Sequence, residues 1–168
     1  LKPEAIDRVV RAIDGFLAVR DSLSTPDHPV VRTVAVATSA ARDARNAADF
    51  AARLRERGIE LSVIPGSREA ALSFSGASID FPGERLMVVD VGGGSTEVVM
   101  GTGGAEPLCA HSFNVGCRRV TEKFLASDPP ALEELARARA WIREQMASWF
   151  ADQAKEAALL ERVVAVAG

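Results

Sequence analysis

Several residue types are scarce in this chain of 168 residues, and each shortage narrows the possible function. Two cysteines and two histidines do not complete a zinc set, and so few thiols indicate a reducing, cytoplasmic compartment. No run of about 18 apolar residues is present, so we expect no membrane span. Lys+Arg total 20 against Asp+Glu 23, and the net charge of −3 gives no electrostatic reason to coat nucleic acid or anionic lipid.

Apolar residues at 48% and charged residues at 26% are the proportions of a globular protein. In the first part of the chain, helical patterns alternate with short apolar runs typical of strands. We expect helices at about 3–20, 46–58 and 67–76, and strands at 31–37 and 61–64, the first of them buried. This alternation favours parallel strands with covering helices, which is an α/β fold.

Residues 78–85 contain a proline and a glycine, and we place a boundary there, giving domains 1–80 and 81–168. The pattern in the second domain predicts strands at 86–91, 96–100 and 106–114, helices at 116–126 and from about 131, and a strand from 163. The first domain has too few strands for a self-sufficient sheet, and the last strand has no return connection. We therefore expect a piece of something longer, truncated at both ends.

The most informative segment is residues 90–97, Asp-Val-Gly-Gly-Gly-Ser-Thr-Glu. Glycines let backbone N–H groups approach an anion, and the hydroxyls add donors. The residues of this expected phosphate cradle are Gly92, Gly93, Gly94, Ser95 and Thr96. Asp90 and Glu97 bracket the loop with carboxylates, which suit a Mg²⁺ ion held against phosphate oxygens. The bland alternative is a glycine-rich hairpin turn with exposed carboxylates.

Two further segments carry polar residues after the strands of the first domain. Ser39 and Arg42 follow the first strand, at the edge of a parallel sheet where ligands usually bind. Glu69 follows the second strand on the first turn of a helix, where spacing alone favours an interaction with the helix dipole. Cys117 also lies near a helix start, but it lacks a neighbouring base, and we expect a buried or half-buried packing residue rather than a nucleophile.

Four blocks, in order along the chain, resemble the exopolyphosphatase / guanosine pentaphosphate phosphohydrolase family, and actinobacterial members in particular. The blocks are Ala-Thr-Ser-Ala with the following Arg-Asp-Ala and Asn (37–46), Gly with Glu-Ala (66–70), the motif at 90–97, and Ser, Gly, Arg and Thr-Glu (112–122). The resemblance implies an actin-like α/β fold of the sugar kinase/Hsp70/actin superfamily, with two ribonuclease-H-like lobes. It implies hydrolysis of terminal phosphoanhydride bonds of inorganic polyphosphate or guanosine pentaphosphate with Mg²⁺, by a homodimer.

The resemblance also implies roles for individual residues. Glu69 matches the catalytic carboxylate that orients or deprotonates the attacking water, Glu97 a further active-site carboxylate, and Asp90 the metal ligand. The phosphate-binding residues would be Gly92, Gly93, Gly94, Ser95 and Thr96, with Ser39 and Arg42 on a second loop. The candidates for holding the rest of a phosphate chain are Arg42, Arg68, and Arg118 or Arg119.

The sequence departs from the family pattern at three places, one of which is the final strand, which resembles the family's stretch leading into Gly-Thr and stops at Gly168. Arg68 stands where the family usually has an acid, which puts a positive charge next to Glu69 in the sequence. The family's amino-terminal Asp-x-Gly-Ser-Asn phosphate loop is not in this chain, so we expect the 168 residues alone to be nearly inactive. Two other functions stay open at this point: a non-catalytic module that binds phosphorylated guanosine nucleotides, and an actin-like ATPase or sugar kinase.

Overall fold

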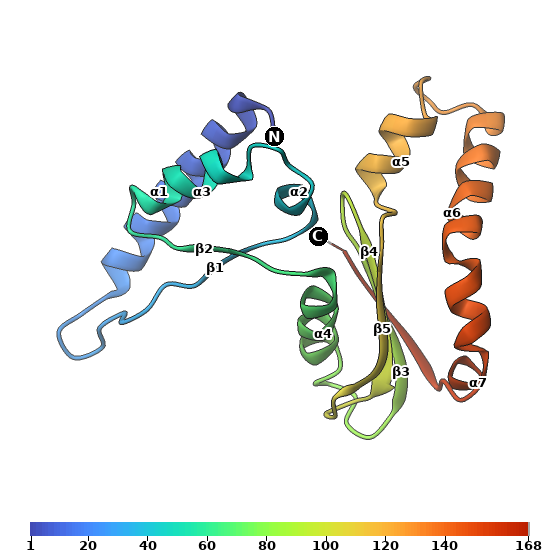
Figure 1. Cartoon of the computed structure of the whole chain (residues 1–168). Coiled ribbons are helices and arrows are strands. Elements are labelled where there is room, and N and C mark those ends of the chain that lie inside the picture. The colour runs from blue at the N-terminus through green and yellow to red at the C-terminus, as the bar shows by residue number, and fades with distance from the viewer. Residues whose placement is uncertain (168) are drawn as a thin grey trace. The chain divides into compact units, whose positions relative to one another are not determined.

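The computed structural model describes residues 1–167 and divides into two compact units, Leu1–Ile64 and Pro65–Gly168 (Figure 1). The sequence placed the boundary at 80/81 instead. The difference arises because helix α4 (Gly66–Ala77) packs on the sheet of the second unit, where its Ala70 and Phe74 are fully buried. No helix within residues 1–167 is both long enough and apolar enough to cross a bilayer.

The first unit consists of two longer helices, one short helix and two short strands. These are α1 (Pro3–Leu23), β1 (Ala35–Ala37), α2 (Ser39–Arg42), α3 (Ala47–Arg55) and β2 (Leu61–Val63). Strand β1 pairs with β2 in parallel, so that Ala35 lies opposite Leu61. The core is formed by buried residues of α1, of α3 and of the turn after it: Ile6, Val10, Phe50, Leu54 and Ile59.

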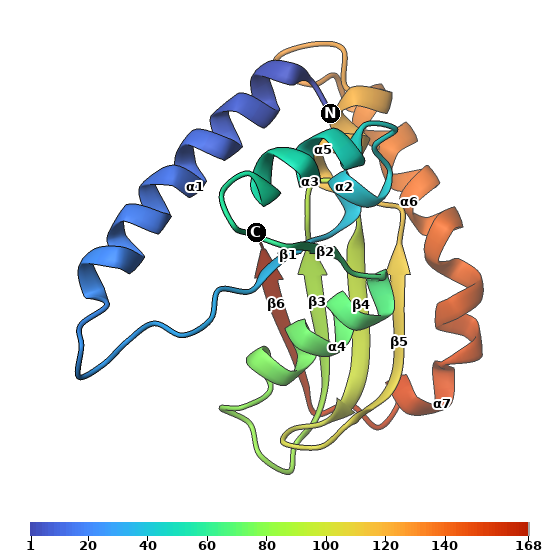
Figure 2. The same cartoon turned by 60° about the vertical axis from the view of Figure 1, so that its left-hand side comes forward.

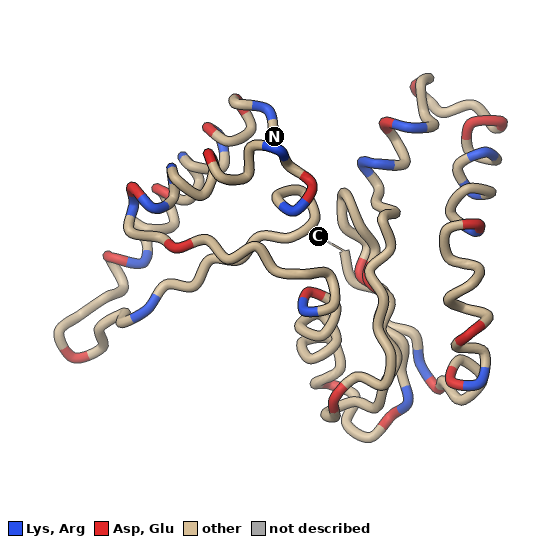
Figure 3. Tube along the Cα trace, in the orientation of Figure 1, with Lys and Arg blue, Asp and Glu red and all other residues tan. Residues whose placement is uncertain are grey.

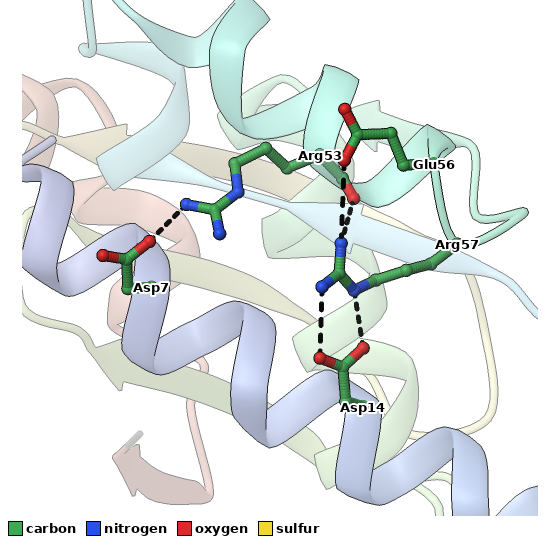
Figure 4. A network of polar contacts seen from close by, with 5 residues as sticks. All are labelled: Asp7, Asp14, Arg53, Glu56 and Arg57. Atoms are coloured by element: carbon green, nitrogen blue, oxygen red, sulfur yellow. Dashed lines mark hydrogen bonds and ion pairs between the residues drawn. The ribbon is translucent and has the colours of Figure 1, made fainter.

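Ion pairs connect α1 with the end of α3 on the surface of this unit (Figure 4). Acidic and basic residues are interspersed along both helices (Figure 3). Arg53 pairs with Asp7, and Arg57 donates two hydrogen bonds to Asp14, at 2.5 and 3.2 Å. The hydrogen bonds from the two guanidinium groups lower the pKa of Asp7 and Asp14. Pairs this exposed contribute little stability each, so the packing of the buried residues holds the two helices together.

The strand expected at 31–37 is wrong in its first half and in its burial. Only Ala35–Ala37 forms a strand, and Val31 is 88% exposed. The reason is the length of β2, which offers ladder partners for those three residues and no more. The β-branched composition of residues 30–34 predicts a strand, but a strand also needs a neighbour.

The second unit is built around a four-stranded sheet. Its further elements are β3 (Arg85–Val91), β4 (Thr96–Thr102), β5 (Pro107–Phe113), α5 (Cys117–Phe124), α6 (Leu132–Asp152), α7 (Ala154–Ala157) and β6 (Arg162–Ala167). The strand order is β5-β4-β3-β6. Strand β4 is antiparallel to both β3 and β5, whereas β6 is parallel to β3.

Helices cover both faces of this sheet (Figures 1 and 2). Helix α4 covers one face, where its buried residues pack on Leu86, Val88 and Val99. Helix α6 covers the other face, where Trp141, Ile142, Met146 and Trp149 pack against Val98, Phe113 and Val115. Because successive strand residues point to opposite faces, β4 is buried on both, and six of its seven residues are buried. The second unit is therefore an α/β layer structure.

Candidate active site

The glycine loop connects β3 to β4 as a tight hairpin. Asp90 lies opposite Glu97 in the antiparallel ladder, and the Gly92 N–H donates to the Ser95 carbonyl at 3.0 Å. The glycines at 92–94 are not among the residues with positive φ, which in the described chain are Gly58, Gly83 and Gly104. This loop therefore does not need glycine for its backbone conformation.

The glycine loop is held by the start of α5 through three successive carbonyl groups. The backbone N–H of Cys117 donates to the Gly92 carbonyl at 3.0 Å. The backbone N–H of Arg119 donates to the Gly93 carbonyl at 3.1 Å, and its side-chain Nε donates to the Gly94 carbonyl at 2.9 Å. The three carbonyls therefore all point toward α5.

This orientation of the carbonyls fixes the direction of three N–H groups. In a planar trans peptide the C=O and the following N–H point in opposite directions. The N–H groups of Gly93, Gly94 and Ser95 thus point away from α5, and none of them donates a hydrogen bond within residues 1–167. Successive N–H groups aimed at one place are a binding site for an anion.

Gly116 explains how α5 comes so close to this loop. A Cβ atom at this position would lie 2.4 Å from the Gly93 carbonyl oxygen and 2.5 Å from the Gly94 nitrogen. The backbone of Gly116 is extended, with φ −146°, so its conformation suits any residue and only the close approach demands glycine. Gly116 lies in the block at 112–122 that resembles the family, but the sequence alone indicated no role for it.

The carboxylates of Asp90 and Glu97 lie on the face of the sheet that α4 covers. The Ser73 hydroxyl donates to Asp90, and the Ser112 hydroxyl donates to Glu97 at 2.6 Å. Glu97 is 2% exposed. Burial raises its pKa, and the negative charges of Glu69 and Asp90 raise it further, against the lowering effect of hydrogen bonds from the Ser112 and Ser95 side chains. Three carboxylates are thus brought together by α4, β3 and β4.

Glu69 lies in the first turn of α4, as the sequence predicts. The helix begins directly after Pro65, whose carbonyl accepts the Glu69 N–H at 3.1 Å. The charge of Glu69 also acts on the buried Glu97 carboxylate, so Glu69 does not interact with the helix dipole alone. Ser73, one turn later on the same helix, was not identified from the sequence, although its spacing of four from Glu69 was a usable signal.

Ser39 and Arg42 both lie on α2, in the first unit. Ser39 is buried, and its Oγ has no hydrogen-bond partner within residues 1–167. A buried hydroxyl without a partner is rare in folded proteins. Arg42 donates to the Ile64 carbonyl at 2.8 Å. These two residues belong to the first unit, whereas the glycine loop belongs to the second.

The remaining candidate residues lie on β4, α4 and α5. The Thr96 hydroxyl is buried and donates to the Val115 carbonyl at 2.6 Å, so its proton is directed at the chain itself. Arg68 is exposed. Arg118 is exposed too and pairs with Glu122 at 2.8 Å. Cys117 is exposed as well, which corrects the expectation of a packing residue; its backbone faces the loop while its side chain does not fill a core.

Mg²⁺ fits the donors that this site offers. Residues 1–167 contain no cluster of three or more His, Cys, Asp or Glu arranged to enclose a metal. Mg²⁺ seldom needs such a cluster, because one or two carboxylates with phosphate oxygens and water complete its shell. The opposed carboxylates of Asp90 and Glu97, on the hairpin that also carries these N–H groups, are a donor set of that kind.

A family model describing the Ppx/GppA phosphatase family matches residues 1–168. The chain belongs to this family. It is 40% identical over 152 residues to exopolyphosphatase 2 of Mycobacterium tuberculosis, covering 86% of this chain and 46% of the relative. It is 34% identical over 144 residues to exopolyphosphatase 1 of Mycobacterium bovis, covering 84% of this chain and 40% of the relative.

Solved structures of the family have the same fold. A crystal structure of an exopolyphosphatase-like protein matches with a TM-score of 0.81 at 34% identity, over 100% of this chain and 52% of that one. The Aquifex aeolicus PPX-GPPA enzyme matches with a TM-score of 0.65 at 30% identity, over 88% and 48%. The expected α/β fold is thereby confirmed. The chain spans about half the length of the relatives it matches.

Proposed function

We propose that the protein to which this chain belongs hydrolyses the terminal phosphoanhydride bond of inorganic polyphosphate. The observation that carries the proposal is the set of N–H groups of Gly93, Gly94 and Ser95, aimed away from α5 and without an acceptor in the described chain. They lie on the hairpin that also carries Asp90 and Glu97. The names of the relatives, exopolyphosphatase 1 and 2, support the choice of substrate.

The chemistry needs positioning and charge neutralisation more than covalent help, since phosphoryl transfer passes through a loose transition state. In this proposal the three N–H groups bind oxygens of the terminal phosphoryl group. They form charge-assisted hydrogen bonds, which are stronger than neutral ones. The Ser112 hydroxyl holds Glu97 in place, and the Ser73 hydroxyl holds Asp90.

Glu69 is proposed to orient the attacking water and to take its proton. Its place on the first turn of α4 puts a carboxylate beside the hairpin on a rigid element. Glu97 is the further active-site carboxylate, and its pKa is raised chiefly by burial, with a smaller contribution from the negative charges of Glu69 and Asp90. Asp90 would hold Mg²⁺, which when bound would offset negative charge on the phosphate oxygens.

The test measures phosphate release by the full-length protein from polyphosphate and, separately, from guanosine pentaphosphate. We expect release from polyphosphate, with a fall of about 10²–10⁴-fold in kcat for Glu69→Gln, the range typical of a lost general base. Glu133→Gln is the matched control, because Glu133 is an exposed glutamate in the first turn of α6. Wild-type rates from Glu69→Gln would refute the role of Glu69.

Other outcomes identify the alternatives. Release from guanosine pentaphosphate alone would replace the substrate while keeping the chemistry. Tight binding of that nucleotide without hydrolysis would favour a sensing module, and ADP production from ATP with sugars would favour a kinase. Each of these results, obtained together with no phosphate release from polyphosphate, would contradict the polyphosphate proposal.

A further inference from the structure

The three carbonyls of the glycine loop accept hydrogen bonds from two different kinds of donor on α5. Those of Gly92 and Gly93 accept backbone N–H groups, which any residue at positions 117 and 119 other than proline supplies. The carbonyl of Gly94 accepts from a side chain, the Nε of Arg119 at 2.9 Å. The last peptide of the loop therefore depends on the identity of residue 119.

We propose that Arg119 is a positioning residue that sets the direction of the Ser95 N–H. The peptide between Gly94 and Ser95 is planar, so fixing the Gly94 carbonyl fixes that N–H. Glycine offers many backbone conformations of similar energy, so without this partner the direction of the peptide is less restricted. The inference rests on the proposed function, because it assigns Arg119 to the orientation of the phosphate cradle rather than to the substrate.

The geometry of the guanidinium suits this role. Arginine presents its donors in a rigid planar group, whereas the ammonium of lysine is a point charge on a flexible stem. The close approach at Gly116 brings the first turn of α5 against the loop, and Arg119 is half-buried there. A planar donor on a short, packed helix can hold a carbonyl in one direction.

The neighbouring arginine provides a natural comparison. Arg118 carries the same charge one position earlier, but it is exposed and its Nε pairs with Glu122 at 2.8 Å. A role that depends on charge alone would be shared by both residues. A role that depends on the direction of the Gly94 carbonyl belongs to Arg119.

The first part of the experiment needs no substrate. The full-length protein, labelled with ¹⁵N-serine and ¹⁵N-glycine, is compared with R119Q, R119K and R118Q by amide resonances. We expect the Ser95 resonance to shift and broaden in both Arg119 variants and to stay unchanged in R118Q. An unchanged Ser95 resonance in R119Q and R119K would overturn the inference, whatever the protein's reaction.

The second part uses inorganic phosphate as the probe and polyphosphate as the substrate. We expect R119Q to bind inorganic phosphate about tenfold more weakly and to lose kcat by a similar factor, which is the usual effect of losing one hydrogen bond to a charged acceptor. The KM for long polyphosphate should change by less than about twofold, because the rest of the chain binds elsewhere. A purely structural role would instead lower the melting temperature without this separation of kcat from KM.

R119K keeps the charge and serves as the second variant if R119Q does not fold. We expect it to bind inorganic phosphate as weakly as R119Q does, and R118Q to bind it as the wild type does. Full recovery in R119K, or equal losses in R118Q and R119Q, would show that charge rather than direction matters and would overturn the inference. If the wild type neither binds phosphate nor hydrolyses polyphosphate, the proposed function fails, and the Ser95 resonance alone decides the role of Arg119.

Discussion

Asp90 and Glu97 are directly opposed residues of the β3–β4 ladder, and their side chains lie on the same face of the sheet. Opposed residues have Cβ atoms roughly 4.5–5.5 Å apart, and like charges in such a pair destabilise a sheet. Glu69 adds a third negative charge. The two serine hydroxyls that donate to Asp90 and Glu97 offset part of the cost. A bound cation would offset the repulsion between these like charges.

Glu97→Gln should be more stable than the wild type at pH 7 although it loses activity. The pKa of Glu97 is raised above its ordinary 4.5, so the folded state holds the proton more tightly than the unfolded state does. Stability therefore falls as the pH rises through the window between 4.5 and the raised value, and glutamine removes this loss. The two proteins should converge near pH 4, where both side chains are uncharged.

Thermal melts at pH 7 and pH 4, with EDTA present, measure the effect of Glu97→Gln. The exposed Glu106→Gln is the control and should change neither value. A lower melting temperature for Glu97→Gln than for the wild type at pH 7 would contradict this account of the buried carboxylate.

Glu134→Gln should destabilise the protein at neutral pH and much less in acid. The Glu134 carboxylate accepts hydrogen bonds from the Ala126 N–H, the Ala131 N–H and the Ser127 hydroxyl, at 3.0, 2.9 and 2.6 Å. These bonds lower its pKa to about 2. The stabilisation is complete above the unfolded value of 4.5 and is lost as the pH falls through about 2.

Urea unfolding of Glu134→Gln at pH 7, 4 and 2.5 tests this dependence, with the adjacent exposed Glu133→Gln as the control. The gap between Glu134→Gln and the wild type should narrow steadily as the pH is lowered. A gap that stays constant over this range would show that the charge of Glu134 does not matter to the loop at 126–131.

Gly116→Ala should cost on the order of 1–3 kcal/mol in the free energy of unfolding, as overpacking usually does. The added Cβ would meet backbone atoms of Gly93 and Gly94, which cannot rotate away. Gly15→Ala is the opposite case, because Gly15 is exposed within α1 and an added Cβ has nothing within 4 Å. It should stabilise the protein by roughly 1 kcal/mol. Urea titration of both variants decides; equal effects would contradict the close approach.

Phe74→Ala should destabilise the second unit by about 3–5 kcal/mol, the usual cost of removing a buried aromatic ring. Phe74 is fully buried, and its Cζ would lie 2.8 Å from a Cβ at Gly101, which shows how tightly the ring packs on β4. Leu72→Ala on the same helix is the control, since Leu72 is 46% exposed and should cost less than about 1 kcal/mol. A comparable loss for both, measured by urea unfolding, would refute the packing of α4.

The sequence predicted the second unit well because its elements are long and strongly patterned. Strand β3 was expected at 86–91 and lies at Arg85–Val91, and the long helix expected from about 131 is α6. One-turn helices such as α2 and α7 were not predicted, because four residues are too few to show a helical periodicity. Strand β1 was overextended because strand propensity is visible in a sequence and the length of a pairing partner is not.

The acidic residues of the site could be predicted, whereas their supports could not. The motif at 90–97 identifies Asp90 and Glu97 by residue type, and the structure opposes them across the hairpin. That Ser73 reaches Asp90 depends on how α4 lies on the sheet. That Thr96 turns to Val115 depends on the path of the chain after β5. Such contacts follow from packing between elements, which local patterns do not encode.

The contacts between α5 and the glycine loop determine which positions of α5 tolerate substitution. Cys117 contributes a main-chain donor, and its side chain is exposed; the Arg118 side chain is exposed as well. Gly116 contributes the absence of a side chain, and Arg119 contributes a particular one. Within residues 116–119, the two outer positions are restricted to one residue type, whereas the two inner positions are not. The hairpin that faces the substrate is thus constrained at 116 and 119, residues that make no contact with the substrate in this proposal.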